Sequence, residues 1–343
     1  YHFGVPLKRS VVKFGSMKTA SLPDIVKTEE DVARIKDTVL SATTLQNYLA
    51  CPAKFYYSKV LKINELDDIT EDAGNNDIGS IFHYVMEKLY VGDENGDTGI
   101  DLTNVLVGKG RMFDEQSRQR LLQNRDIIEH LVCRGFEDIL KIRNVSKESL
   151  EGRNRLYFDI ILQCVLDLIK KEKPFVFINA EEQITGSVTI KVGDEELKVR
   201  IGGIIDRQHI DSEGRYCVID YKTGEVHSEK IKTLDSLFEN SKLKAVFQTM
   251  LYCKLLYDSG NGGEYYPGVI YIQGLYKDDL NFGLEMNGKM LSYNDSNKEE
   301  FDELLRNTLS KLFDPNVDFD AKYVERSCEY CPYKTLCQTN FGV

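Results

Sequence analysis

The residues most able to support chemistry are two carboxylates and a lysine. Asp220 and Lys222 are two positions apart in an apolar segment, so on a β-strand their side chains share one face and those of Ile219 and Tyr221 the other. Asp206 can lie beside Asp220 on the preceding strand of the same hairpin. Adjacent carboxylates repel unless a cation neutralises them, and their oxygens suit Mg²⁺ or Mn²⁺. With a lysine to stabilise an anion or help deprotonate water, the group is equipped for metal-assisted phosphodiester hydrolysis.

The simpler interpretation of Asp220 and Lys222 is a salt bridge on a solvated strand face. The preceding run, Cys217-Val218-Ile219, is apolar on both faces of the strand. Such a pattern indicates a buried central strand, where charges without a purpose are costly. The context therefore favours a chemical role for the pair.

Two segments around these residues match a known family. Gly-Ile-Ile-Asp-Arg at 203–207 and Val-Ile-Asp-Tyr-Lys-Thr-Gly at 218–224 resemble the core of PD-(D/E)xK nucleases, in particular their RecB-type branch. The resemblance implies that Asp206 and Asp220 hold the divalent metal and that Lys222 serves catalysis. It also implies an α/β, restriction-endonuclease-like fold with a central mixed β-sheet flanked by helices.

The resemblance extends to two helical motifs. Gly79 and His83 match the G-x-x-x-H helix that supplies a metal-binding histidine in this branch, and Gln248 and Tyr252 match its Gln-x-x-x-Tyr helix. Taken alone, His83 would be an ordinary helix histidine. Side chains four residues apart share a helical face, so Gln248 and Tyr252 can both reach the site or the DNA strand. The expected metal ligands are His83, Asp206, Asp220 and the backbone carbonyl of Tyr221.

The family also places a catalytic glutamate on the strand before the hairpin, where this sequence offers two candidates. Glu181 has the usual spacing to the next apolar residue, Ile184, whereas Glu182 has the same strand parity as Ile184. We take Glu181 as the expected residue and keep Glu182 as the alternative.

The cysteines form a second constellation. Cys328, Cys331 and Cys337 lie within ten residues, close enough to bind one metal centre, and Cys51 is the natural fourth ligand. The pattern Leu-x2-Tyr-x2-Cys-Pro-x2-Phe-x-Tyr at 45–57, with the distant C-x2-C-x5-C, resembles the iron-sulfur nuclease domain of AddB-type helicase-nuclease subunits and related CRISPR adaptation nucleases. The resemblance implies that the four thiolates bind a structural [4Fe-4S] cluster.

Thiolate spacing alone does not distinguish iron from zinc, so a zinc site with the same ligands stays open, as does an unliganded tail. The remaining cysteines lie inside apolar periodic segments, where a free thiol behaves as a small hydrophobic side chain. We expect core positions for Cys133, Cys164, Cys217 and Cys253.

The pattern along the chain predicts a mainly helical first half, a β-meander, and a mixed region ending in the cysteine-rich tail. We expect helices over 41–57, from Gly79, over 113–142, 156–171, 242–257 and 300–313, and strands over 175–184, 186–192, 197–208, 215–221 and 269–275. Residues 1–40 would be a lead-in from an upstream region. Residues 41–343 would form the nuclease domain, with a helical insertion at about 91–172 and the cysteine cluster at 328–337.

The composition suggests a globular chain that acts away from membranes. Its 44 Lys and Arg against 55 Asp and Glu give a net charge of −11, so we expect the fragment alone to bind DNA poorly. No stretch approaches the roughly 18 apolar residues of a membrane span, and no signal pattern begins the chain, so we expect a cytoplasmic protein. It begins with Tyr1 rather than Met, and we expect a piece of a longer polypeptide.

We therefore expect a Mg²⁺- or Mn²⁺-dependent DNA nuclease, the C-terminal module of an AddB-like helicase-nuclease in double-strand break repair and recombination. Its partners would be DNA, as single strands or duplex ends, and a helicase subunit or domain. One alternative is a catalytically silent nuclease fold that guides DNA or holds a partner. Another is a free-standing RecB-like exonuclease.

Overall fold

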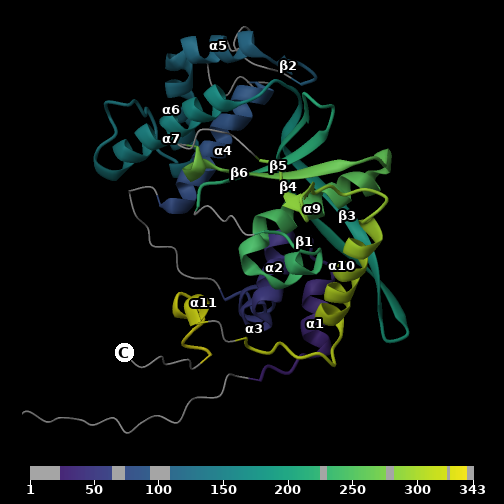
Figure 1. Ribbon diagram of the computed structural model, residues 1–343. Helices are drawn as coiled ribbons and strands as arrows, with labels where there is room; N and C mark the ends of the chain where they lie inside the picture. Colours follow the sequence, from purple (N-terminus) through teal and green to yellow (C-terminus); the bar gives the residue numbers. More distant parts are fainter. Residues whose placement is uncertain are drawn as a thin grey trace, which may run out of the picture.

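The sheet and its flanking helices are seen in a computed structural model (Figure 1) that describes residues 24–63, 74–92, 109–224, 230–275, 282–322 and 325–337. A six-stranded sheet has the order β2-β3-β4-β5-β6, with β1 paired to β4, and β7 and β8 form a separate pair. The strands are β1 (Leu40–Ser41), β2 (Met112–Phe113), β3 (Phe175–Val192), β4 (Glu195–Asp211), β5 (Tyr216–Lys222), β6 (Tyr265–Tyr271), β7 (Glu285–Met286) and β8 (Lys289–Met290).

The sheet is mixed, as expected from the sequence. β3, β4 and β5 form an antiparallel meander, β2 joins β3 antiparallel, and β6 lies parallel to β5. β1 is parallel to β4. The expected α/β fold class is thus confirmed.

Helices surround the sheet, and most of the first half of the chain is helical, also as expected. They are α1 (Glu29–Lys36), α2 (Ala42–Ala50), α3 (Pro52–Phe55), α4 (Asn75–Val91), α5 (Glu115–Gln123), α6 (Arg125–Leu140), α7 (Gly152–Lys171), α8 (Asp235–Glu239), α9 (Lys244–Leu256), α10 (Lys298–Phe313) and α11 (Glu325–Glu329). Of the helices in the described ranges, none combines the length and the apolar character that a bilayer crossing requires.

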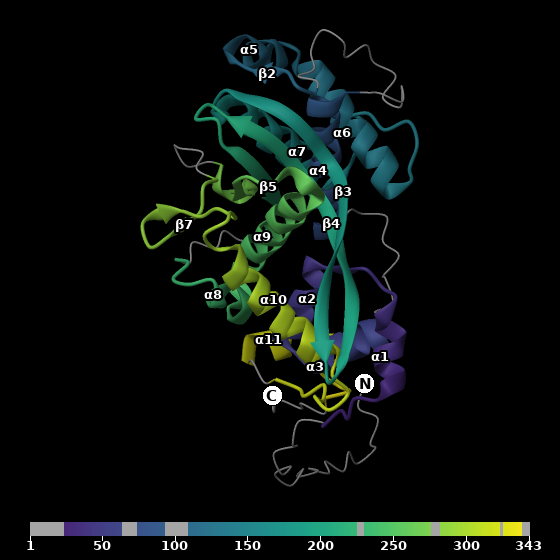
Figure 2. The same ribbon diagram turned by 90° about the vertical axis from the view of Figure 1, so that its right-hand side faces the viewer.

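Two hydrophobic cores hold these layers together. Figures 1 and 2 show α4, α5, α6 and α7 grouped at one end of the molecule and α1, α2, α3 and α10 at the other. The first group buries Phe82 and Phe158 against Ile219 of the sheet, and the second group, with α9, buries Leu45 and Phe247 against Val218. Neighbouring residues of β5 therefore face opposite cores, as a pleated strand requires.

Several element boundaries differ from the sequence-based expectation for local reasons. α4 begins at Asn75, not Gly79, because the Asp77 carboxylate caps the N–H of Gly74 at 2.7 Å. β3 is one continuous strand, whereas two strands over 175–184 and 186–192 were expected, because Thr185 between them pairs with Gly202 of β4. β6 begins at Tyr265 and ends at Tyr271, where a 3₁₀ turn follows.

The expected helix over 113–142 was also wrong in its extent. It is divided into α5 and α6 around Asn124, and it is preceded by the short strand β2. The Asn124 backbone has a non-helical ψ of 51°, which ends one helix and begins the next. By contrast, Ser41 caps α2 as expected, since its hydroxyl accepts from the N–H of Thr44 at 3.1 Å.

Along the long β3–β4 hairpin, one face of the strands packs against one core in its first part and against the other core in its second part. On β4, Val199, Ile201 and Ile205 belong to the core beside α9 and α10, whereas Arg207 packs on Phe175 of the other core at 4.9 Å. Strict alternation would put these odd-numbered residues on one face. The change therefore falls near position 206, and Figure 2 shows that this long hairpin is strongly twisted.

Candidate active site

Three adjacent strands bring the predicted acidic residues together. The register pairs Arg207 with Ile219, so Asp206 falls opposite Asp220 where β4 and β5 begin to separate. On the other side, the pairs Ala180–Arg207 and Glu182–Ile205 leave position 181 opposite Asp206. Glu181 itself has a left-handed φ of 47°, which is uncommon for a residue with a side chain. The site therefore lies where β3 departs from regular geometry.

Helix α4 supplies an imidazole to the two carboxylates of β3 and β4. His83 Nδ1 lies 3.1 Å from Glu181 Oε1 and 3.6 Å from Asp206 Oδ1. The donor atoms of these three residues all lie within 4.8 Å of one another, the only group of three potential metal ligands found in the described ranges. Two carboxylates and one imidazole suit a divalent cation such as Mn²⁺ or Mg²⁺, so this donor set fits the metal that the sequence predicts.

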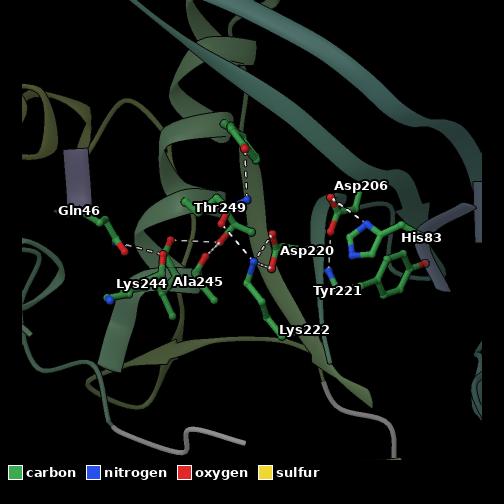
Figure 3. A network of polar contacts seen from close by, with 12 residues as sticks. Gln46, His83, Asp206, Asp220, Tyr221, Lys222, Lys244, Ala245 and Thr249 are labelled. Atoms are coloured by element: carbon green, nitrogen blue, oxygen red, sulfur yellow. Dashed lines mark hydrogen bonds and ion pairs between the residues drawn. The ribbon is translucent and has the colours of Figure 1, made fainter. Parts of the chain in front are cut away.

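The Asp206 carboxylate is fixed by the neighbouring strand. The backbone N–H of Tyr221 donates to Asp206 Oδ2 at 2.6 Å, while Oδ1 faces His83 (Figure 3). One oxygen is therefore used for position, and the other is free to bind a ligand. The Tyr221 ring contacts His83 edge-on, with ring centroids 5.9 Å apart. Tyr221 thus braces both predicted metal ligands.

Asp220 and Lys222 begin a chain of polar contacts toward α9. Lys222 Nζ lies 2.8 Å from Asp220 Oδ2 and donates to Gln248 Oε1 at 3.2 Å. Gln248 Nε2 in turn donates to the Tyr252 hydroxyl at 3.2 Å. Gly203 makes room for that tyrosine, because a Cβ there would lie 2.5 Å from the hydroxyl oxygen. The sequence-predicted lysine, glutamine and tyrosine therefore form one connected unit.

Burial and neighbouring charges shift the pKa values of the ionisable residues in the site. Burial, and then the negative charge of Asp220, raise the pKa of Asp206 to about 7. Burial also raises the pKa of Asp220, against the opposing effect of Lys222. Burial alone would lower the pKa of His83, but its hydrogen bond to Glu181 and the charge of Asp206 raise it to about 9. The site thus concentrates negative charge that a proton or a metal cation must offset.

The structure separates the two glutamate candidates. Glu181 contacts His83, whereas Glu182 accepts a hydrogen bond from the Gln208 side chain on β4. Glu182 was the alternative because it should share a strand face with Ile184. That argument is not decisive, because the left-handed backbone at Glu181 interrupts the regular alternation of side chains between the two faces. Glu181 is therefore the one beside the other site residues.

An open groove of about 630 Å³ gives solvent access to this group. It is lined by His83, Glu181, Tyr221 and Lys222, and by Glu87 one turn along α4 from His83. Burial, with the charge of Glu181 among the further causes, raises the pKa of Glu87. A substrate in this groove would meet the imidazole and carboxylates on one wall and Lys222 on another.

Sequence reasoning missed one support of the site. Arg207 is completely buried, forms an ion pair with the buried Glu172, and lies over the rings of Tyr90, Phe175 and Tyr221. It braces Tyr221 from the side away from the groove. The available signal was an arginine that follows Asp206 and the apolar run at 201–205, where a charge that becomes buried needs a partner.

The four predicted cysteine ligands lie near one another, beside α2, α3 and the start of α9. Cys51 comes from the junction of α2 and α3, and all four line one cavity of about 250 Å³. Burial, and then the charges of the other three cysteines, raise the pKa of Cys337 to about 11. Elsewhere, Cys133, Cys217 and Cys253 are buried as expected, and Cys164 is half-buried.

The thiols are more widely spaced than in a formed zinc site. Tetrahedral zinc with bonds of about 2.3 Å would place its sulfur atoms roughly 3.8 Å apart. Within the described ranges, no three cysteine sulfur atoms lie within 4.8 Å of one another, since only the His83 group meets that distance. In the described residues, the four thiols therefore line one cavity without forming a compact ligand set.

Comparison with known proteins gives one family and several distant relatives. A model of the PD-(D/E)XK nuclease superfamily matches residues 39–338. An uncharacterized protein of Rickettsia typhi is 24% identical over 193 residues, which cover 56% of this chain and 19% of that protein. An uncharacterized protein of Rickettsia bellii is 22% identical over 214 residues, covering 61% and 22%. This chain thus spans about a fifth of the length of the curated relatives it matches.

A solved structure, titled "Crystal structure of SSO0001", is also similar to this chain. It is 13% identical, covers 90% of both chains and has a TM-score of 0.29.

Proposed function

The chain belongs to the PD-(D/E)XK nuclease superfamily, and from this membership and the site geometry we propose that it is a Mg²⁺- or Mn²⁺-dependent deoxyribonuclease. The observation that carries the proposal is the convergence of His83, Glu181 and Asp206 on one point beside the Asp220–Lys222 pair. This combination joins a set of oxygen and nitrogen ligands to a cation that can assist hydrolysis. Superfamily members usually cleave phosphodiesters, which agrees with that chemistry.

Each site residue has a proposed task. His83, Glu181, Asp206, Asp220 and the Tyr221 carbonyl would hold the divalent metal, which supplies Lewis-acid activation of the phosphodiester and its attacking water. The Tyr221 N–H keeps Asp206 in place through Oδ2. Lys222 positions or helps deprotonate the attacking water, or stabilises the anion that develops.

Gln248 and Tyr252 act on Lys222 in this proposal. Lys222 Nζ has Asp220 on one side and Gln248 Oε1 on the other, so its ammonium group is held between two acceptors. Tyr252 fixes the Gln248 amide by accepting from its Nε2. The three residues thereby restrict the lysine to the side of the groove that faces the carboxylates.

The experiment is cleavage of an end-labelled single-stranded DNA with Mn²⁺, comparing wild type with Asp220→Asn. We expect the wild type to release mononucleotides or short fragments and the variant to lose at least about 100-fold in rate. A Glu213→Gln variant, at an exposed turn, controls for the removal of one negative charge. Equal rates for wild type and Asp220→Asn, or no cleavage by either, would contradict the proposal.

We further propose that the four cysteines hold a [4Fe-4S] cluster, with zinc as the alternative occupant. The cavity that all four thiols line supports a common metal centre, and the resemblance of the cysteine motif to iron-sulfur nuclease domains favours iron-sulfur. The cluster would join the α2–α3 junction to the C-terminal segment and thereby stabilise the domain. Iron and acid-labile sulfide, with a brown colour that Cys331→Ser abolishes, would support it, whereas stoichiometric zinc would contradict it.

The biological setting that we propose is an AddB-like helicase-nuclease in double-strand break repair and recombination. The paired cysteine and nuclease motifs support this assignment, and the much greater length of the relatives leaves room for a motor in the same polypeptide. A helicase domain or subunit would deliver single strands to the groove. Co-purification of the full-length protein with DNA-dependent ATPase activity tests this setting, and its absence would contradict it.

A further inference from the structure

A stripe of side chains along α9 links the catalytic group to the cysteine cavity. Lys244, Gln248 and Tyr252 are spaced four residues apart, so they lie on one face of the helix, with about 6 Å along the axis between successive positions. Gln248 touches Lys222 at 3.2 Å. Lys244, one turn away, lines the cysteine cavity. The same helix face therefore extends from the predicted metal site to that cavity.

Lys244 is matched by a second lysine across the cavity. Lys54 of α3 lines the same cavity, and partial burial and the charge of Lys54 lower the pKa of Lys244. No carboxylate contributes to that shift, and neither ammonium group has an ion-pair partner in the described part of the chain. The two lysines thus present positive charge that the protein itself does not neutralise.

The surrounding surface is basic although the whole chain is acidic. The cavity is lined by Lys54, Lys244, Lys322 and Lys334 against the single acid Glu239, whereas the net charge of the chain is −11. A local concentration of one sign of charge attracts ligands of the opposite sign. The cavity edge is therefore suited to an anion.

The relative position of the two lysines is fixed by the fold. Gln46 of α2 donates to the Lys244 carbonyl at 3.1 Å, which ties α2 to the first turn of α9 (Figure 3). α3, which carries Lys54, follows α2 after Cys51. In Figure 3, His83 and Asp206 lie on one side of Lys222 and Lys244 on the other. Lys244 is thus one helical turn from Gln248, the residue that contacts Lys222, and Lys54 lines the same cavity as Lys244.

From this arrangement we propose that Lys54 and Lys244 form a phosphate-binding subsite for the single strand being cut, next to the scissile position and on its cysteine-cavity side. The inference rests on the proposed nuclease function and names the course of the substrate along α9. The lysines bind backbone phosphates, which carry no sequence information. They therefore raise the affinity for single strands and fix the position of the strand equally for every DNA sequence. A different occupant, the anionic metal-thiolate centre itself, would also attract these lysines, and the test separates the two.

The test measures binding of a fluorescent single-stranded oligonucleotide by anisotropy, without added divalent metal, over a range of salt concentrations. We compare wild type with the double variant Lys54→Gln/Lys244→Gln. We expect roughly tenfold weaker binding at low salt, with a slope of log affinity against log salt smaller by about 1.4, that is about 0.7 for each lost phosphate contact. The loss should be the same for oligonucleotides of different sequence.

The control removes two exposed lysines that do not line the cysteine cavity, in Lys191→Gln/Lys198→Gln on the β3–β4 hairpin. It changes the net charge equally and should leave the salt slope at its wild-type value. A second readout is hydrolysis of bis(p-nitrophenyl) phosphate with Mn²⁺. When bound at the catalytic centre, this small diester is too short to contact the two lysines as well. Lys54→Gln/Lys244→Gln should therefore hydrolyse it at the wild-type rate, whereas the KM of the variant for the oligonucleotide should rise.

Two results would overturn the subsite. One is a double variant that binds the oligonucleotide like the control. The other is a double variant that loses iron or visible absorbance with unchanged DNA binding, which would assign the lysines to the metal-thiolate centre. Failure of the nuclease function is distinguishable, because the wild type itself would then cleave neither substrate.

Discussion

The backbone N–H of Tyr221 donates to Asp206 Oδ2 at 2.6 Å, so the strand that carries Asp220 also fixes the carboxylate of the neighbouring strand. This bond replaces a regular ladder contact at the point where β4 and β5 separate. It leaves Asp206 Oδ1 directed at His83 and Glu181.

The first prediction concerns pH. The folded pKa of His83 is about 9, above its usual 6.5, so the stability from its protonated form is complete below pH 6.5 and is lost as the pH rises toward 9. The pKa of Asp206 is also raised, to about 7, so the stability from its protonated form is likewise lost as the pH rises from about 4 to 7. We expect the metal-free protein to lose on the order of 3 kcal/mol between pH 6.5 and 9.5, because each unit of pKa shift corresponds to about 1.4 kcal/mol.

Metal binding should show the opposite trend, because Mn²⁺ competes with these protons. Its affinity should increase over the same pH range. Urea unfolding at several pH values, with and without Mn²⁺, measures both effects. A metal-free stability that rises from pH 6.5 to 9.5 would be inconsistent with protonated His83 between the two carboxylates.

The second prediction compares adjacent glutamates. Glu181→Gln removes a charge that contacts His83, whereas Glu182→Gln alters a residue paired with Gln208. We expect the first change to weaken Mn²⁺ binding at least about tenfold and the second to leave it within about twofold. Calorimetric titration of both variants checks this, and equal losses would remove the distinction.

The third prediction concerns the support of the lysine. Gln248→Leu removes the acceptor of Lys222 Nζ and the donor to Tyr252. We expect kcat to fall at least about tenfold, in line with about 1.5 kcal/mol or more for one hydrogen bond to a charged group, while Mn²⁺ affinity stays constant. Tyr252→Phe should have a smaller effect of the same kind. A changed metal affinity with normal kcat would place Gln248 in a different role.

The fourth prediction tests the buried ion pair behind the site. Arg207 and Glu172 are 0% and 1% exposed, so Arg207→Met should lower the free energy of unfolding by about 3–5 kcal/mol by leaving a buried carboxylate unpaired. The double variant Arg207→Met/Glu172→Leu should recover most of that loss. Chemical denaturation of the three proteins measures it, and additive losses in the double variant would show that the pair is not coupled.

The sequence allowed much of this site to be predicted, for reasons that lie in strand geometry. The alternation at Asp220 and Lys222 and the hairpin turn before β5 are enough to place Asp206 beside Asp220. The helical spacing of Gln248 and Tyr252 puts both on one face, and their contacts with Lys222 follow that spacing. These are local patterns that one sequence carries.

Other features depend on tertiary structure and had no local signal. The choice between Glu181 and Glu182 depends on the left-handed backbone at Glu181, and propensities do not predict a positive φ at a glutamate. The continuity of β3 through Gly186 depends on its pairing with Ile201 of β4. The acidic run at 64–77 contains no basic residue and so predicts a solvated loop, but all except its last four positions lie outside the described residues.

The central claim is that His83, Glu181 and Asp206, with Asp220 beside them, bind one divalent cation. Titration of the metal-free protein with Mn²⁺, followed by electron paramagnetic resonance of the free ion, measures this directly. We expect wild type to bind Mn²⁺ and His83→Ala and Asp206→Asn each to bind it at least about tenfold more weakly, with Glu213→Gln unchanged. Wild-type affinity in both His83→Ala and Asp206→Asn would contradict the account.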